Sequence, residues 1–226
     1  MTSALLLCAG RGERLRPLTD TLPKPLVEVG GETLVGRHLR ALAAAGVTRV
    51  VINLGWLGER IVDHVGDGAR YGLRVPYSPE GYPTLDTGGA IVRALSLLDA
   101  APFWVVNADT YTDFDFGPGA AALLDGREAA IGLTPNPEYR DAGDFSPAGG
   151  FAHNTGEVSQ TFSGIACYSP MFFSDCEDGR FSVVPLLRAA ARAGALGAFD
   201  VGSHWYDVGT PERLATLRAT VASSSL

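Results

Sequence analysis

Short apolar runs alternate with amphipathic segments along most of the chain. The runs predict buried strands at residues 1–7, 47–53, 73–77, 103–107, 129–134 and 162–168, and a late strand ending at 205–210. Between and after them, helical periodicity and end signals predict helices at 33–45, 58–65, 87–98, 184–193 and 211–221. Alternation of strands and helices favours a mostly parallel sheet covered on both faces. The pattern therefore predicts an α/β fold.

The alternation weakens in one internal stretch. Residues 135–158 are rich in Pro, Gly, Asn and Asp, which favour turns. We predict a mobile flap or an antiparallel hairpin there, with the flap spanning 135–160. The whole chain, 1–226, is predicted to be one domain, since this length suffices for one substantial core. No internal repeat suggests a fused β-helical module, and the pattern predicts no oligomeric state.

Composition excludes several classes of protein. A formal net charge of −7 disfavours a general nucleic-acid binder. No stretch approaches the roughly 18 apolar residues of a membrane span, and residues 1–7 read as a core strand instead of a signal peptide. The three cysteines lack metal-ligand spacing or a disulfide framework, so we expect a reducing cytoplasm. Cys8, at a strand end, is expected to be a small buried hydrophobe.

The first strand runs into a turn that carries the clearest chemistry. The turn reads Ala9-Gly10-Arg11-Gly12-Glu13-Arg14, and Pro23-Lys24-Pro25 follows. Glycine lets the backbone approach an anion, successive N–H groups form an anion-binding concavity, and guanidinium groups match phosphate oxygens. The turn lacks the Gly-Lys-Ser/Thr of a P-loop and the third glycine of a dinucleotide fingerprint. It therefore predicts a different way of holding a nucleoside triphosphate by its phosphates.

Two carboxylates lie at predicted strand ends. Asp109 follows the 103–107 strand, and Asp207 lies near the end of the late strand. Ligands of open α/β sheets bind beyond the carboxyl ends of the strands, and Mg²⁺ prefers oxygen ligands such as carboxylates, phosphates and water. Asp109 and Asp207 are therefore the candidate ligands of Mg²⁺.

These motifs together resemble the sugar-1-phosphate nucleotidyltransferases. The resemblance rests on the N-terminal signature and on VNADTYTDFDF, YSPEGYPTLDTGG, TFSG and HWYDVGTPERL, in family order, over roughly residues 3 to 218. GERLRPLT, NLGWLGERI and TFSGI look like the short uridylyltransferases that act on N-acetylmuramate α-1-phosphate in peptidoglycan recycling. The resemblance implies a Rossmann-like three-layer nucleotidyltransferase fold with a mostly parallel mixed sheet, Mg²⁺ dependence and release of pyrophosphate.

The resemblance also implies roles for particular residues. Arg14, Lys24 and Asp109 would be catalytic, with Arg14 on the departing pyrophosphate and Lys24 on the α-phosphate and the sugar phosphate. The nucleotide would contact Ala9, Gly10, Arg11, Gly12, Glu13, Arg14, Lys24, Glu80, Thr87, Gly88 and Gly89. The sugar would face Asn107, Asp144, Ser163 and Gly164, in and around the TFSG segment. Asp109 and Asp207 would bind magnesium.

The sequence departs from the family pattern at several positions. Cys8 and Ala108 stand where the family usually has Ala and a frequent Gly, and LDTGGA replaces the subgroup's more usual LETGGG. Residues 145–160, where the sugar should be recognised, match poorly. The LDTGGA run is also compatible with guanylyltransferases acting on mannose- or heptose-1-phosphate.

Two other kinds of protein remain as alternatives. A non-catalytic nucleotide-sugar-binding regulatory protein would be expected to have lost Lys24, Arg14 or an aspartate, and all are present. A choline-phosphate cytidylyltransferase would need an aromatic or anionic box. None of the four histidines receives a catalytic role, and packing or capping is expected for His204.

Overall fold

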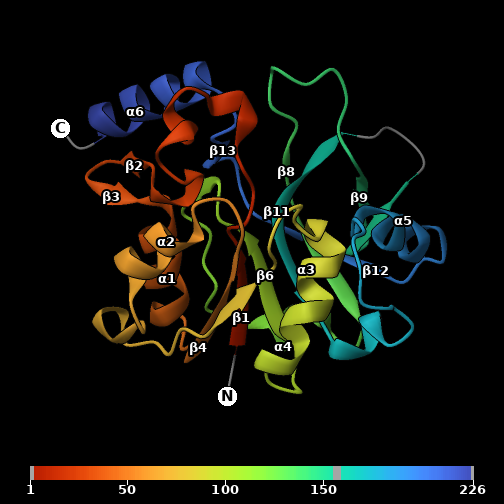
Figure 1. Cartoon of the computed structure of the whole chain (residues 1–226). Coiled ribbons are helices and arrows are strands. Elements are labelled where there is room, and N and C mark those ends of the chain that lie inside the picture. The colour runs from red at the N-terminus through yellow and green to blue at the C-terminus, as the bar shows by residue number, and fades with distance from the viewer. Residues whose placement is uncertain (1–2, 155–158, 225–226) are drawn as a thin grey trace.

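A nine-stranded sheet forms the centre of the described part of the molecule, which comprises residues 3–154 and 159–224 of a computed structural model (Figure 1). In sheet order the strands are β5 (Tyr77–Pro79), β4 (Arg49–Leu54), β1 (Ser3–Leu7), β6 (Phe103–Asn107), β11 (Gln160–Tyr168), β8 (Ala129–Pro135), β12 (Leu196–Asp200), β10 (Phe151–His153) and β9 (Ser146–Ala148). The register shows that β11 and β10 run opposite to the other strands. The predicted α/β fold with a mostly parallel mixed sheet is confirmed.

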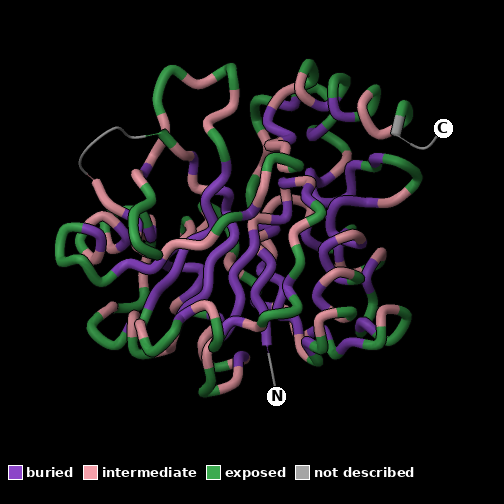
Figure 2. The backbone as a smooth tube through the Cα atoms, turned by 180° about the vertical axis from the view of Figure 1, so that it is seen from behind, coloured by how far each residue is buried: buried purple, intermediate pink, exposed green. Residues whose placement is uncertain are grey.

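Helices cover both faces of this sheet. Residues along β1 alternate between faces, so that Leu6 joins one apolar cluster and Leu5 the other. The Leu6 face is covered by α1 (Leu34–Ala44), α2 (Gly58–Val65) and α4 (Ala120–Leu124). The opposite face is covered by α3 (Asp86–Ala94) and α5 (Val184–Arg192). Figure 2 shows the buried strands between these exposed outer layers.

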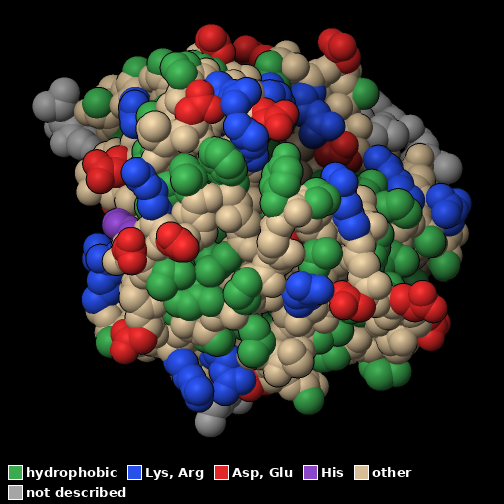
Figure 3. Space-filling model, viewed as in Figure 1, with side chains coloured by type: hydrophobic (Ala, Val, Ile, Leu, Met, Phe, Trp, Pro, Cys, Tyr) green, Lys and Arg blue, Asp and Glu red, His purple; other side chains and the backbone are tan. Residues whose placement is uncertain are grey.

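A smaller assembly stands at the edge of the sheet where β1 and β6 end. It contains β7 (Thr110–Thr112) paired with β13 (Trp205–Asp207), β2 (Glu28–Val29) paired with β3 (Glu32–Thr33), and α6 (Pro211–Ser224). Leu15, Val208 and Leu214 belong to a separate apolar cluster that joins α6 to the N-terminal loop. This edge is at the top of Figure 1, and charged side chains of both signs gather along it in Figure 3.

Short 3₁₀ helices occupy the connections. They are η1 (Glu13–Leu15), η2 (Leu18–Asp20), η3 (Lys24–Leu26), η4 (Ala69–Tyr71), η5 (Leu95–Leu97) and η6 (Pro170–Phe173). The first three give the N-terminal turn its compact shape. No helix among the described residues is long and apolar enough to cross a membrane.

Most predicted elements are present, with informative shifts. Helix α2 and strand β6 have the predicted bounds, and Thr33 caps α1 by accepting a hydrogen bond from the Gly36 N–H. The bounds predicted for the strand at 73–77 are wrong: β5 begins at Tyr77, and only an isolated bridge at Arg74 precedes it. Pro76 separates the two, because proline has no N–H for the ladder.

The flap region combines a loop with a hairpin. Within the stretch predicted to be a flap, β9 and β10 form an antiparallel hairpin next to β12. Residues 155–158 of that stretch lie outside the described residues. The mobility of the flap stays a prediction.

Candidate active site

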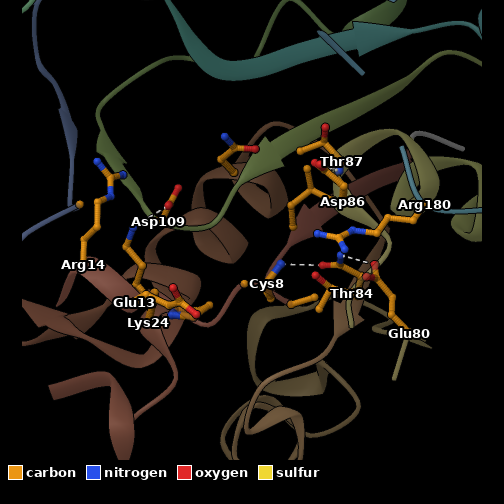
Figure 4. A pocket seen from close by; sticks show the side chains of 18 residues that line it. Cys8, Glu13, Arg14, Lys24, Glu80, Thr84, Asp86, Thr87, Asp109 and Arg180 are labelled. Carbon is orange, nitrogen blue, oxygen red and sulfur yellow. Dashed lines mark hydrogen bonds and ion pairs between the residues drawn. The ribbon is translucent and has the colours of Figure 1, made fainter. Parts of the chain in front are cut away.

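A cleft of about 510 Å³ opens beyond the carboxyl ends of β1, β4 and β6 (Figure 4). Its lining includes ten residues predicted to bind substrates: Ala9, Gly10, Gly12, Glu13, Arg14, Lys24, Glu80, Thr87, Asn107 and Asp109. In Figure 4, Arg14, Glu13, Lys24 and Asp109 lie at one end and Glu80, Thr84, Thr87 and Arg180 at the other. The cleft therefore has two chemically distinct ends.

Glycine shapes the first end. Gly10 lines the cleft, and a Cβ added there would meet nothing within 4 Å. Gly12 has φ of +67°, and its carbonyl accepts a hydrogen bond from the Thr19 hydroxyl at 2.8 Å. The hydrogen bond from Thr19 thus fixes the left-handed turn at Gly12, and the space next to Gly10 stays open for a ligand.

Arg14 and Lys24 supply the positive charge at this end. Within residues 3–154 and 159–224, no carboxylate forms an ion pair with the exposed Arg14. Lys24, the single lysine of the chain, has a nearly buried side chain whose Nζ lies 2.6 Å from Asp109 Oδ2. A free guanidinium and a fixed ammonium therefore face the same space, as phosphate binding requires.

The two aspartates predicted to bind a metal lie on adjoining backbone segments, and of the two only Asp109 lines the cleft as the described residues form it. Asp207 is paired in the β13–β7 ladder with Thr110, and the Val208 N–H donates to the Asp109 carbonyl at 3.1 Å. Asp207 Oδ2 accepts a hydrogen bond of 2.6 Å from Arg213 Nη1. Each carboxylate is thus matched with a base, Asp109 with Lys24 and Asp207 with Arg213.

This donor set suits a hard divalent cation. The described residues contain no group of three or more His, Cys, Asp or Glu side chains that could hold a metal by themselves. A cation here would rely on the two carboxylates, with phosphate oxygens and water completing its shell, which is the usual environment of Mg²⁺.

A buried chain of hydrogen bonds lies at the end of the cleft that contains Glu80. The Cys8 N–H donates to Asn53 Oδ1 at 2.5 Å, and Asn53 Nδ2 donates to Glu80 Oε1 at 2.6 Å. The other oxygen of Glu80 accepts from the Leu85 N–H at 2.8 Å. Asn53, only 3% exposed, therefore connects the ends of β1, β4 and β5 and orients Glu80.

Several lining residues were not predicted. Asn53 ends a predicted strand with a polar side chain, the same signal that identified Asp109, so it could have been found. Thr84, Asp86 and Arg180 also line the cleft, but they lie in or beside irregular segments without periodicity. Asp86 has φ of +60° and accepts a hydrogen bond from the Thr87 N–H.

Three residues predicted to bind the nucleotide do not line the cleft. The N–H groups of Gly88 and Gly89 both donate to the Phe181 carbonyl, at 2.9 and 3.1 Å. A Cβ on Gly89 would lie 2.0 Å from the Gly179 carbonyl oxygen. These glycines thus permit close packing of α3 against the loop that carries Arg180. The Arg11 guanidinium stacks 4.2 Å from the centre of the Trp56 ring.

The residues predicted to face the sugar are divided. Asn107 lines the cleft, and Gly164, with φ of +78°, packs against its side chain, where a Cβ would lie 2.6 Å from Asn107 Nδ2. Gly164 therefore positions Asn107 from the irregular part of β11. Ser163 is fully buried, and its hydroxyl donates to the Gly132 carbonyl at 2.8 Å.

Asp144 fixes the loop between β8 and β9. Its carboxylate accepts two hydrogen bonds from Arg140, at 2.8 and 3.0 Å, and one of 3.0 Å from the Phe162 N–H. These partners tie the base of the loop to β11. The assignments of Asp144, Ser163 and Gly164 to sugar binding stay predictions.

The environments of Cys8 and His204 do not suit a nucleophile or a general base in the cleft. Cys8 is 1% exposed, and burial, followed by the Asp109 carboxylate, raises the pKa of its thiol far above the usual range. The prediction that Cys8 is a small buried hydrophobe is confirmed by its burial. His204 is exposed and contacts Asp113 at 3.1 Å.

Comparison with known proteins agrees with this geometry. A family model described as Nucleotidyl transferase matches residues 3–143. The chain is 43% identical over 223 residues to an N-acetylmuramate α-1-phosphate uridylyltransferase of Neisseria meningitidis, with 96% of each chain covered.

More distant relatives share the same fold. A mannose-1-phosphate guanyltransferase of Schizosaccharomyces pombe is 33% identical over 94% of this chain, which spans 62% of that relative. Among solved structures, HddC from Yersinia pseudotuberculosis matches with a TM-score of 0.80 and 25% identity, covering 97% of this chain and 99% of that one.

Proposed function

Because the chain belongs to the nucleotidyl transferase family and is a sugar-1-phosphate nucleotidyltransferase, we propose that it joins UTP to N-acetylmuramate α-1-phosphate. The products would be UDP-N-acetylmuramate and pyrophosphate. Similarity over nearly the whole chain to relatives named for this reaction supports the substrate pair. The same resemblance leads us to propose a role in peptidoglycan recycling in the cytoplasm.

The observation that carries the reaction class is a cleft with two chemically distinct ends. One end offers Arg14, Lys24 and the open space above Gly10 to phosphates, and the other offers Glu80 and Arg180 to a base and ribose. Asn107 and Asp109 lie on the β6 side of the phosphate end. A nucleoside triphosphate and a sugar phosphate can thus meet at Lys24.

The chemistry needs no general base from the protein. A phosphate monoester is largely ionised at pH 7, because its second pKa is about 6. An oxygen of the sugar phosphate forms a bond to the α-phosphorus of the nucleotide, and the bond from that phosphorus to the β-phosphate oxygen breaks. The obstacles are repulsion between the anions and the negative charge that collects on pyrophosphate, so positioning and electrostatic stabilisation dominate.

The side chains of the cleft address these two obstacles. Lys24 would neutralise the α-phosphate and the approaching sugar phosphate. Its ion pair with Asp109 fixes the position of its ammonium group. Arg14, without a carboxylate partner among the described residues, would bind the β- and γ-phosphates as they depart. Asp109 and Asp207 would hold Mg²⁺, which supplies charge neutralisation to phosphate oxygens when bound.

Guanylyl transfer is the second candidate. The relatives include mannose-1-phosphate guanyltransferases and a structure described in complex with GMP-PN. The base subsite here presents the Arg180 guanidinium and a Glu80 carboxylate that already accepts two hydrogen bonds. Each carboxylate oxygen can accept a further hydrogen bond, so Glu80 is compatible with either base, and the similarity to the uridylyltransferases carries the preference for UTP.

Pyrophosphate release distinguishes these possibilities. The purified chain would be incubated with Mg²⁺ and each of UTP, GTP, CTP, ATP and dTTP against a panel of sugar 1-phosphates that includes N-acetylmuramate, N-acetylglucosamine, mannose and heptose esters. We expect the highest kcat/KM with UTP and N-acetylmuramate α-1-phosphate. Preference for GTP with a mannose or heptose ester would contradict the proposed substrates and keep the reaction class. Nucleotide binding without turnover of any pair would favour a different acceptor such as phosphocholine, or a non-catalytic regulatory role.

A further inference from the structure

Arg213 borders the cleft although it was not predicted as a site residue. It lies in the first turn of α6, and its Nη1 is 2.6 Å from Asp207 Oδ2. Gly209 lines the cleft, and a Cβ added there would lie 2.9 Å from Arg213 Nη1 and 3.0 Å from both Asp207 oxygens. The ion pair thus lies directly beside Gly209, at a point where the cleft is lined by a residue without a side chain.

The Arg213–Asp207 pair repeats the arrangement of Lys24 and Asp109. Both pairs have a nitrogen–oxygen distance of 2.6 Å, and both carboxylates are candidate metal ligands. If Asp109 and Asp207 bind a divalent cation, their negative charge is shared with that cation. Lys24 and Arg213 are then less fully neutralised by their carboxylate partners. Two cations then become available to anionic substrates at the same place.

Tyr139 gives Arg213 a second support that does not depend on Asp207. Its ring centre lies 3.6 Å from Arg213 Cζ, and it comes from the loop between β8 and β9. Both this loop and α6 stand at the upper edge in Figure 1. Arginine can stack on an aromatic face and still present its N–H groups sideways to an anion.

Charged groups converge on this position from several elements. Burial and then the Asp207 carboxylate raise the pKa of the Tyr139 hydroxyl, and three arginines oppose that shift: Arg213, Arg140 and Arg14. Arg140 is held by both oxygens of Asp144. Of these three arginines, Arg213 is therefore the one whose ion-pair partner among the described residues is also a candidate metal ligand.

We propose that Arg213 is a second cationic ligand of the sugar substrate, stored on Asp207 until that carboxylate binds a divalent cation and steadied by the ring of Tyr139. This inference rests on the proposed function. The anionic oxygen that Arg213 binds belongs to the sugar substrate, and either its phosphate or the carboxylate of its lactyl group can supply it. A purely structural Arg213 would explain the pair with Asp207 but not the aromatic support at an open cleft.

Two measurements test the proposal, because Arg213→Gln should strengthen the binding of the metal ion and weaken the binding of the sugar phosphate. The variants are Arg213→Gln, Arg213→Lys, Tyr139→Ala and Tyr139→Phe, and the control is Arg218→Gln, an exposed arginine of α6 that contacts the Glu28 carbonyl. The first measurement is Mn²⁺ affinity by electron paramagnetic resonance with a non-hydrolysable UTP analogue. Arg213→Gln should tighten the Kd up to about fivefold, the equivalent of losing a competing ion pair of about 1 kcal/mol.

The second measurement is the KM for the sugar phosphate at saturating UTP and Mg²⁺. Arg213→Gln should raise it about tenfold or more, as loss of a charge-assisted hydrogen bond implies. Arg213→Lys should recover part of this loss, Tyr139→Ala should raise KM, and Tyr139→Phe and Arg218→Gln should resemble the wild type. N-acetylglucosamine 1-phosphate, which lacks the lactyl carboxylate, separates the two sources. An equal rise in KM with both sugars assigns the phosphate, and a rise confined to N-acetylmuramate assigns the carboxylate.

Two results would overturn the proposal. Weaker Mn²⁺ binding in Arg213→Gln would show that Arg213 only positions Asp207, and an unchanged sugar KM would show that it does not contact substrate. If the wild-type chain turned over neither sugar, the substrates of the proposed function would be wrong. The Mn²⁺ measurement would then decide alone, and a Kd that does not tighten in Arg213→Gln would refute the storage of Arg213 on Asp207.

Discussion

Lys24 Nζ and Asp109 Oδ2 lie 2.6 Å apart, although 85 residues separate them in the chain. The lysine enters from η3 and the aspartate from the turn after β6. The chain has 18 basic residues, and every one except Lys24 is an arginine. A compact ammonium on a flexible stem thus occupies the one position where we propose that the reacting phosphates meet.

Replacing Lys24 tests its contact with the reacting phosphates. Lys24→Ala should lower kcat by roughly 10²- to 10³-fold, by analogy with removal of one preorganised donor. Lys24→Arg should not restore the rate, because the larger planar group does not fit a nearly buried side-chain site. The measurement is steady-state pyrophosphate release, with circular dichroism to show that the variants fold. Full kcat in Lys24→Ala would exclude the assigned role.

The buried chain of hydrogen bonds through Asn53 should be needed for both stability and nucleotide binding. Asn53→Ala removes the acceptor of the Cys8 N–H and one donor to Glu80. We expect a loss of about 1–3 kcal/mol in the free energy of unfolding and a higher KM for the nucleotide. Asn53→Asp keeps the acceptor and loses the donor, so denaturant titration and kinetics separate the two contacts. If both variants bound UTP like the wild type, Glu80 would not depend on Asn53.

Two glycines of the signature motifs should respond in opposite ways to the same substitution. Gly10→Ala meets no neighbouring atom, so the melting temperature should stay unchanged while the KM for the nucleotide rises about tenfold or more. Gly89→Ala forces a Cβ against the Gly179 carbonyl and should cost about 1–3 kcal/mol of stability. Thermal melts and kinetics on both variants check this. A destabilised Gly10→Ala with unaltered KM would mean that Gly10 serves the fold and not the ligand.

His38 should make the protein less stable in mild acid. The side chain is 1% exposed, and burial lowers its pKa to about 4, against the opposing effect of its 2.8 Å hydrogen bond to the Thr110 carbonyl. The unfolded chain, with a histidine pKa near 6.5, binds a proton before the folded chain does. Stability from the neutral His38 is therefore complete above pH 6.5 and is lost as the pH falls to about 4, by about 3 kcal/mol in total.

Urea titrations of the wild type and His38→Gln at several pH values measure this contribution. The difference in unfolding free energy between them should shrink steadily from pH 7 to pH 4. His204→Gln, at an exposed position, is the matched control. A constant difference across this range would rule out His38 as the group responsible.

The sequence predicted the sheet and the phosphate end of the cleft more fully than the sugar side. Strand β6 and helix α2 have strong periodicity and clear end residues, so their bounds were predicted to the residue. Strand β12 was missed because Leu196–Asp200 contains alanine and glycine, which have low strand propensity, and its pairing with β8 stabilises it. Local signals cannot reveal such tertiary support.

The same distinction holds within the site. Arg14 and Lys24 belong to a contiguous motif, and their placement at the cleft follows from the strand that precedes them. The Arg213–Asp207 pair spans only six positions, but its place beside the cleft depends on the pairing of β13 with β7, and the Tyr139 stack depends on a loop rich in turn residues. Gly88 and Gly89 look like ligand-binding glycines in the sequence, yet their N–H groups bind the Phe181 carbonyl.

Attack of the sugar phosphate on the α-phosphorus of the nucleotide is tested most directly by isotope labelling. The measurement is ³¹P NMR of the products formed with Mg²⁺, UTP and N-acetylmuramate α-1-phosphate that carries ¹⁸O in all three non-bridging positions. We predict that all label appears in the nucleotide sugar, with one ¹⁸O in the bridge between its two phosphorus atoms, and that pyrophosphate is unlabelled. Label in pyrophosphate, or a nucleotide sugar with ¹⁶O in that bridge, would contradict the mechanism.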